Sequence, residues 1–227
     1  AALGLPKGYE IARDQFVYEC KDGCAPSALA NNPVKTVVKD GKITVSDERF
    51  SFVFNKQKGI VESYQMDGQE YAHDGFGLQP NFWRAPTDND YGNGAPSRSL
   101  VWKEASRQFK VATAQVTKTK NATVLRVVYD LPAGNRYLVD YTFMGNGMVK
   151  ADITFTAAKK GLGEVPRVGM RRRLPVAFNN ISYLGRGPQE NYIDRKHGSF
   201  FDVYQTTADA MYYPYVRPQE NGHRTGT

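Results

Sequence analysis

Three stretches of this 227-residue chain gather side chains that could do polar chemistry. The first, residues 81–92, reads NFWRAPTDNDYG and places two carboxylates, an amide and a guanidinium within seven residues. Such groups can hydrogen-bond densely to sugar hydroxyls, and aromatic rings beside them can stack on the face of a sugar. The candidate binding or pocket-shaping residues here are Trp83, Arg84, Asp88, Asn89 and Asp90.

The same stretch has a purely structural interpretation. Pro86 fixes its own backbone angle, Asp and Asn side chains cap turns, and Arg84 can pair with one of the aspartates. The chemistry of the residues alone favours this self-satisfied loop over a binding loop.

The second stretch, residues 184–195, reads LGRGPQENYIDR and contributes Glu190 as a candidate. Its glycines suggest a phosphate-binding loop, but it lacks the G-x-x-x-x-G-K-[ST] pattern and no helix pattern follows. The third stretch, residues 211–224, reads MYYPYVRPQENGHR and contributes Glu220, Asn221 and His223. Its aromatic and amide side chains suit either a sugar-facing rim or an interface with another domain.

The elements that must position these stretches are strands. Phe50, Phe52 and Phe54 alternate with smaller residues, a partner strand is predicted over 60–66, and Asp67-Gly68 closes it with a hairpin signal. Residues 75–99 show little periodicity and are expected to form a long irregular loop, followed by a short helical turn near 98–106. Further strands are predicted at 110–117, 123–129, 136–143, 148–156, 168–175 and 200–205. The pattern predicts an all-β, antiparallel sandwich.

The first 41 residues differ from the rest. Residues 8–18 are expected to form a single strand without a neighbour, so 1–18 is interpreted as the last strand of a domain mostly absent from this sequence. Residues 19–41 are rich in Gly, Pro, Asn, Ala and Ser and predict a linker, which places the start of the sandwich domain at residue 42.

Composition excludes several classes of function. The net charge is +7, but Lys and Arg are dispersed, and the densest run, residues 171–173, is interpreted as a solvated strand face or an inter-domain contact. We therefore expect no nucleic-acid partner, and no apolar run is long enough to predict a membrane span. Cys20 and Cys24 could form a disulfide or remain free thiols, and too few ligands accompany them for a zinc site. The compartment stays open between the cytoplasm and the periplasm of a bacterial cell.

The three stretches together resemble one family. RAPTDND with Gly92, then LGRGPQENYIDR, then MYYPYVRPQENGHR are similar to the signature stretches of the small-chain domain of glycoside hydrolase family 2 β-galactosidases, in the same order. The opening LPKGYEIARDQF resembles the final strand of the immunoglobulin-like domain that precedes it in those enzymes.

This resemblance implies a supersandwich like that of galactose mutarotase, in an enzyme that removes terminal β-linked galactose with retention. It implies two catalytic glutamates in a neighbouring (β/α)₈ barrel, so no catalytic residue and no metal site are expected in this chain. The parent enzyme is expected to use Mg²⁺ and Na⁺, to pack its barrel and immunoglobulin-like domain against this one, and to form homo-oligomers. Since the family domain continues beyond its ENG-x-R stretch, residues 42–227 are expected to be incomplete, with unpaired strand edges.

Two other functions remain open. A free-standing sugar epimerase of the mutarotase kind would need a general acid and a general base, for which Glu190, Glu220 and His223 are the candidates. A non-catalytic carbohydrate-binding module would need an exposed aromatic platform, which Trp83 could form with Tyr212, Tyr213 and Tyr215.

Overall fold

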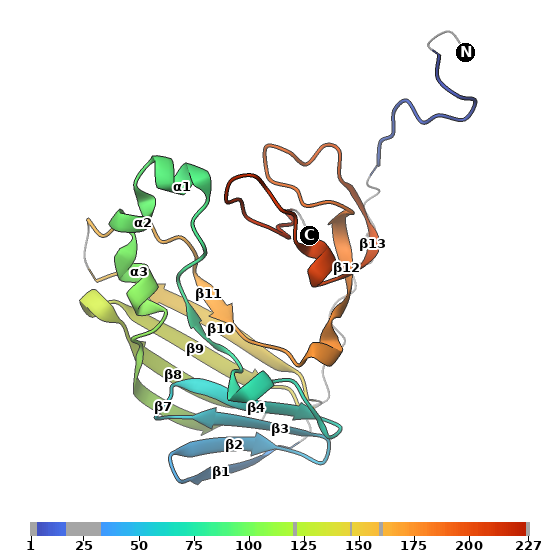
Figure 1. Cartoon of the computed structure of the whole chain (residues 1–227). Coiled ribbons are helices and arrows are strands. Elements are labelled where there is room, and N and C mark those ends of the chain that lie inside the picture. The colour runs from blue at the N-terminus through green and yellow to red at the C-terminus, as the bar shows by residue number, and fades with distance from the viewer. Residues whose placement is uncertain (1–3, 17–32, 120–121, 146, 159–160, 226–227) are drawn as a thin grey trace. The chain divides into compact units, whose positions relative to one another are not determined.

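The structure is a computed structural model that describes residues 4–16, 33–119, 122–145, 147–158 and 161–225 (Figure 1). The chain divides into two compact units. The sandwich unit comprises residues 26–178 and 215–219, and the hairpin unit comprises residues 1–25, 179–214 and 220–227. Each unit is described here by itself.

The first layer of the sandwich unit is an antiparallel sheet of five strands in sequence order. They are β1 (Lys35–Lys39), β2 (Lys42–Ser46), β3 (Phe50–Asn55), β4 (Ile60–Met66) and β5 (Gln69–Glu70). Two-residue Asp-Gly turns with positive φ join β1 to β2 and β4 to β5, as expected for tight hairpins. Alternation along β2 and β3 buries one face of this sheet.

The second layer is an antiparallel four-stranded sheet in the order β10-β9-β8-β7. Its strands are β7 (Lys110–Lys118), β8 (Thr123–Asp130), β9 (Arg136–Phe143) and β10 (Val149–Thr156). The two layers meet face to face, since the Phe52 ring centroid lies 5.3 Å from that of Tyr141 and 5.0 Å from that of Phe143. This aromatic core confirms the predicted all-β antiparallel sandwich.

Shorter elements complete the sandwich unit. A two-stranded sheet pairs β6 (Gln79–Asn81) with β11 (Gly169–Arg171), and three short helices follow β6, namely α1 (Asp88–Gly92), α2 (Ala95–Arg98) and α3 (Leu100–Ala105). Turns of 3-10 helix occur at His73–Gly75, Pro132–Gly134 and Val176–Phe178. In α3 the side chain of Trp102 is buried in the aromatic core, which fixes the helices to the sheets.

The hairpin unit is built on β12 (Asn180–Gly187) and β13 (Phe200–Thr207), which pair along their full length. A 3-10 turn at Asp209–Met211 follows β13. The Gln15 side-chain amide bonds the backbone of Phe201 as a strand residue would, donating from Nε2 to the carbonyl at 2.8 Å and accepting from the amide at 2.5 Å.

Most predicted strands are confirmed within two residues of their ends, and so is the short helix near 98–106. The predicted irregular stretch 75–99 is partly wrong, because β6, α1 and α2 lie within it. Their periodicity escapes notice since each is five residues or fewer. The predicted strand 168–175 shortens to β11, and Arg171 and Arg173 place their guanidinium groups over the ring of Phe76.

Two predictions at the N-terminus need correction. Residues 8–16 form no strand in the structure as described. A strand requires backbone hydrogen bonds to a neighbouring strand, whereas here the Gln15 side chain makes the hydrogen bonds to the backbone of Phe201. The predicted linker ends too late, since Lys35–Lys39 is strand β1 and belongs to the sandwich. Residues 19–32, including both cysteines, lie outside the described residues, and the assignment of 1–18 to a preceding domain stays a prediction.

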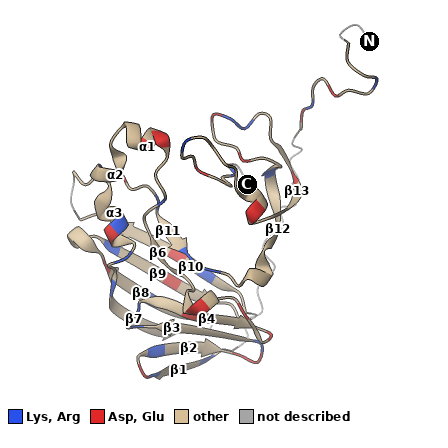
Figure 2. Ribbon diagram, in the orientation of Figure 1, with Lys and Arg blue, Asp and Glu red and all other residues tan. Residues whose placement is uncertain are grey.

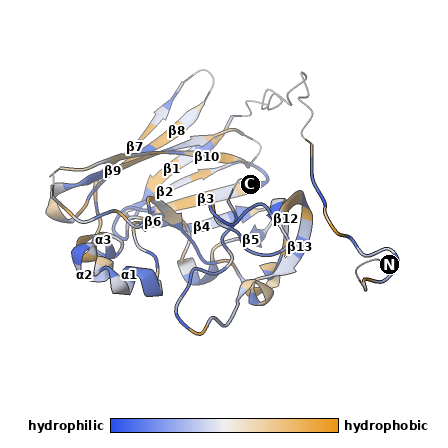
Figure 3. Cartoon of the chain, turned by 90° about the horizontal axis from the view of Figure 1, so that it is seen from above, coloured by the Kyte–Doolittle hydropathy of each residue, from blue (hydrophilic) through white to orange (hydrophobic). Residues whose placement is uncertain are grey.

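Charged residues are spread over the whole described chain (Figure 2), whereas apolar residues concentrate on the strands of the sandwich unit (Figure 3). Blue and red residues are scattered over the elements, with the red of Asp88 and Asp90 gathered at α1 (Figure 2). Orange, apolar residues concentrate on the sandwich strands, and α1 is mostly blue (Figure 3). In the part of the chain that the structure describes, no helix is long and apolar enough to cross a membrane.

Candidate functional site

The loop that leaves β6 is anchored in the sandwich core at its first residues. Phe82 is fully buried, its ring lies 5.1 Å from that of Tyr137, and its backbone amide donates to Ser106 Oγ at 2.8 Å. Asn81 Nδ2 donates to the Trp83 carbonyl at 3.0 Å. The polar residues that follow are therefore held from a rigid base.

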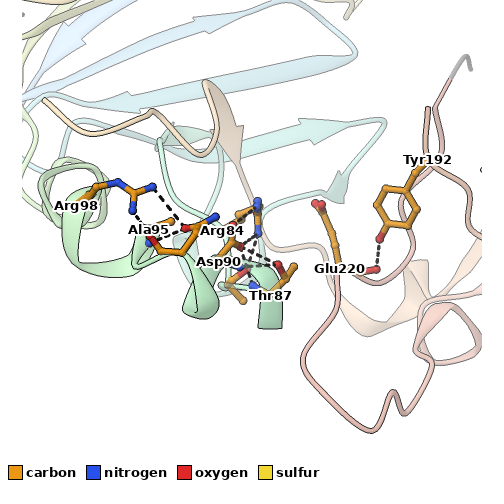
Figure 4. Close-up of polar contacts among 9 residues, drawn as sticks. Arg84, Thr87, Asp90, Ala95, Arg98, Tyr192 and Glu220 are labelled. Carbon is orange, nitrogen blue, oxygen red and sulfur yellow. Dashed lines mark hydrogen bonds and ion pairs between the residues drawn. The ribbon is translucent and has the colours of Figure 1, made fainter. Parts of the chain in front are cut away.

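Arg84, Thr87 and Asp90 form one closed set of contacts (Figure 4). Arg84 Nη1 lies 2.6 Å from Asp90 Oδ2, and both side chains are at least three-quarters buried. Thr87 is the N-cap of α1: its hydroxyl accepts from the Asp90 amide, while Asp90 accepts from the Thr87 amide at 2.8 Å. Burial alone would raise the pKa of the Asp90 carboxyl, but hydrogen bonds from Arg84 and Thr87 outweigh it and lower this pKa.

Asp88 connects the same helix to a distant part of the chain. Its carboxylate accepts from Arg217 Nη1 at 3.2 Å, and its backbone amide donates to the Pro218 carbonyl at 2.8 Å. Residues 215–219 thereby belong to the sandwich unit although they follow the hairpin strands in sequence. Asn89 is exposed, and its backbone carbonyl accepts from the Asn93 amide at the end of α1.

Beside this loop the sandwich unit contains a pocket of about 230 Å³. Trp83, Arg84 and Asp90 contribute to its walls, and so do residues that the sequence reasoning did not single out; the role of the three in shaping a substrate pocket stays a prediction. The missed polar residues are Asn93, Arg98, Ser99 and Glu164. No local sequence pattern predicts that these residues share a pocket. Arg98 and Glu164, for example, are 66 positions apart in the chain, yet Arg98 Nη2 lies 3.3 Å from Glu164 Oε1.

In the hairpin unit, Glu190 is held by the segment that contains the third stretch. Its Oε2 accepts from the Gly222 amide at 3.1 Å, and its side chain is only 10% exposed. Its Oε1 is buried without a hydrogen bond, and the closest cation among the described residues is Arg195 at 3.7 Å. The neighbouring Asn191 is fully buried and accepts from the Thr225 amide at 2.9 Å.

The other candidates of the third stretch also make structural contacts. The His223 ring stacks on Tyr192 with centroids 4.8 Å apart, and the Tyr192 hydroxyl donates to the Glu220 carbonyl at 2.5 Å (Figure 4). Asn221 Oδ1 accepts from the Tyr213 amide at 2.5 Å. The second stretch and residues 211–214 and 220–224 of the third are therefore brought together within the hairpin unit, whereas the first stretch and residues 215–219 belong to the sandwich unit.

Among the described ranges, no group of three or more His, Cys, Asp or Glu side chains comes close enough to hold a metal ion. The carboxylates of the first stretch face guanidinium groups instead, and that of Glu190 faces a backbone amide. Such contacts orient and stabilise loops. The charged side chains that line the pocket are two cations, Arg84 and Arg98, and two anions, Asp90 and Glu164, so their formal charges sum to zero.

The comparison with protein families decides the assignment. The model of the family described as "Beta galactosidase small chain" matches residues 46–227, which include all three stretches. The chain belongs to the β-galactosidase small-chain family.

Relatives of this chain occur in several bacteria. It is 35% identical over 221 residues to a β-galactosidase of Priestia megaterium, covering 96% of this chain and 21% of that protein. It is 32% identical over 225 residues to a β-galactosidase of Streptococcus thermophilus, covering 98% of this chain and 21% of that protein. The chain thus spans about a fifth of the length of the relatives that it matches.

Proposed function

We propose that this chain is the non-catalytic small-chain sandwich of a longer, retaining β-galactosidase of glycoside hydrolase family 2. Its role is to shape the substrate pocket and to brace the catalytic barrel, with no hydrolysis by the chain alone. The observation that carries the proposal is the match of residues 46–227 to the small chain, with its three polar stretches in order.

The state of the carboxylates supports a structural role. A retaining glycosidase needs a nucleophile and an acid/base about 5–5.5 Å apart, and the acid requires a raised pKa. Asp90 instead has a lowered pKa, since Arg84 and Thr87 hydrogen-bond to its ionised form despite its burial. Asp88 is paired with Arg217, and Glu190 accepts a backbone amide.

The remaining functions of the parent enzyme belong to the same proposal. Terminal β-D-galactosides are its substrates, and the catalytic glutamates and the ligands of Mg²⁺ and Na⁺ lie in other domains. The immunoglobulin-like domain precedes this sandwich, and the assembled enzyme is a homo-oligomer.

The test uses a chromogenic β-galactoside. The 227-residue chain should release no chromophore above the buffer rate. A chimera in which the chain replaces the matching fifth of the Priestia megaterium β-galactosidase should hydrolyse the substrate, while that enzyme without the segment should not. Turnover by the chain alone, or a folded chimera without activity, would contradict the proposal.

One observation favours a second candidate, a sugar epimerase. The carboxylate of Glu190 is nine-tenths buried with Oε1 free of hydrogen bonds, as a general base could be, and His223 lies in the same unit. Polarimetry of α-galactose decides this alternative. Mutarotation faster with the chain than with buffer, and slowed by Glu190→Gln, would support the epimerase and exclude a purely structural role.

A further inference from the structure

The pocket beside α1 and α2 has the size and lining of a small ligand site. Its volume of about 230 Å³ falls below the roughly 300–1,000 Å³ typical of sites for drug-sized molecules. Trp83 supplies an aromatic wall, and the polar lining consists of Arg84, Asp90, Asn93, Arg98 and Glu164. Pro86, Pro96 and Pro166 add apolar surface.

Several polar groups of this lining retain unused hydrogen-bonding capacity. The Oδ1 of Asn93 accepts from the Ala95 amide at 2.9 Å, but its Nδ2 donates to no other described residue. The Nε groups of Arg84 and Arg98 likewise make no hydrogen bond within the described chain, where their Nη atoms do all the pairing. Glu164 is 71% exposed, so its carboxylate can accept further bonds.

The walls are also fixed before any ligand arrives. Arg84 and Asp90 hold one side, and on the other side Ser99 Oγ donates to the Glu164 carbonyl at 2.8 Å. Trp102 Nε1 donates to the Gly163 carbonyl at 2.6 Å, and a Cβ at Gly163 would lie only 2.2 Å from the Arg98 carbonyl oxygen. These contacts order the backbone segments that carry the lining, so less backbone entropy is lost on binding.

The charge of the lining selects among ligand classes. Two guanidinium groups and two carboxylates neutralise each other, so neither a phosphate nor a cation is favoured. Spare donors and acceptors beside an aromatic ring instead suit a neutral, hydroxyl-rich ring with one apolar face.

From this geometry we infer that the pocket is a monosaccharide-binding subsite. Trp83 packs against the apolar face of one pyranose ring, Asn93 and the two arginines donate to its hydroxyls, and Glu164 accepts from one of them. The inference rests on the proposed function only for the choice of galactose as the first sugar to test.

Titration of methyl β-D-galactoside into the 227-residue chain, followed by ligand-observed NMR and calorimetry, tests the inference. Asn93→Ala should weaken binding about threefold to tenfold through one lost hydrogen bond, and Glu164→Gln by a similar factor because a neutral amide oxygen accepts less strongly than a carboxylate. Glu104→Gln is the matched control: it removes the carboxylate of an exposed residue of α3 outside the pocket and should leave the dissociation constant unchanged. Circular dichroism confirms that each variant is folded.

Two results would overturn the inference. One is the absence of saturable binding by methyl β-D-galactoside and methyl β-D-glucoside alike. The other is binding that Asn93→Ala and Glu164→Gln leave as strong as Glu104→Gln does. Either result leaves the activity of the chimera untouched, so failure of the subsite and failure of the proposed function are separable.

Discussion

The two units of this chain are both built from antiparallel strands but are held together differently. Every fully buried apolar side chain of the described residues belongs to the sandwich unit, where phenylalanines and tyrosines of two sheets interlock. The buried side chains of the hairpin unit are polar, namely Asn191 and Ser199. One face of its hairpin instead exposes Leu184 and Val203, which lie opposite each other in register and are each more than 60% exposed.

This difference means that the two units are stabilised by different interactions. Aromatic burial gives the sandwich unit a core of its own, because burial of apolar area is the dominant favourable term in folding. The hairpin unit depends on specific hydrogen bonds, each of which contributes little but fixes direction. Apolar burial therefore accounts for the stability of the sandwich unit, and hydrogen bonds account for the loop conformations of the hairpin unit.

The largest effect is expected in the sandwich core. Phe52→Ala removes a fully buried ring that contacts Tyr64, Tyr141 and Phe143, and should lower the free energy of unfolding by about 3–5 kcal/mol. Urea denaturation followed by circular dichroism measures it. The control Phe201→Ala removes a 44% exposed ring of β13 and should cost far less. Equal costs would refute the contrast between the units.

A smaller, confined effect is expected for Asn191→Ala in the hairpin unit. The change removes a buried amide that donates to the Arg186 carbonyl and accepts from the Thr225 amide, which leaves both partners unsatisfied. The expected cost is about 1–3 kcal/mol. Hydrogen exchange should show faster exchange in 180–225 outside the 215–219 segment, with β3 and β8 unchanged. Loss of protection across the sandwich strands would mean that the two units unfold as one.

The pH dependence of the sandwich unit should sharpen the comparison. Hydrogen bonds from Lys42 and Lys58 lower the pKa of Glu62 to about 2. Because the folded pKa lies below the unfolded value of about 4.3, the stabilisation is complete above that value and is lost as pH falls toward 2. Glu62→Gln should cost up to about 1 kcal/mol at pH 7 and only a small part of that at pH 2, where the carboxyl of the folded chain is partly protonated. A cost that is the same at both pH values would contradict this origin.

The smallest effect is expected on the exposed face of the hairpin unit. Val203→Thr keeps a β-branched residue in β13 and removes apolar surface that is mostly exposed to water. The free energy of unfolding should therefore change by less than about 0.5 kcal/mol. Thermal melts of this variant and of the unsubstituted chain provide the measurement. A large destabilisation would show that Val203 is buried in solution.

Local patterns explain how much of this structure the sequence predicts. The alternation at Phe50, Phe52 and Phe54 predicts β3 because side chains in a strand point to opposite faces in turn. The pairing of Arg84 with an aspartate is also predictable, since the partners are six positions apart and a proline shapes the loop between them. Asp40-Gly41 is an equally clear turn signal for the first hairpin, but the linker-like composition before it hides strand β1.

Contacts between distant segments could not be predicted in the same way. Asp88 meets Arg217 across 129 positions, and nothing in either local sequence selects the partner. The pocket has the same origin, because Glu164 reaches it from a loop that carries no motif. A sequence pattern reveals which residues are polar and how strands alternate, whereas surface pairing depends on how the sheets bring loops together.

The central claim is that the carboxylates of the polar stretches hold loops and do not react with substrate. The most direct test is kcat of the chimera with the Priestia megaterium enzyme, compared with its Asp90→Asn and Glu190→Gln variants on a chromogenic β-galactoside. At a temperature where all three are folded, kcat should stay within about threefold, because no group acting in the transition state is removed. A fall of 10²-fold or more in either folded variant, as expected for loss of a general acid or base, would contradict the account.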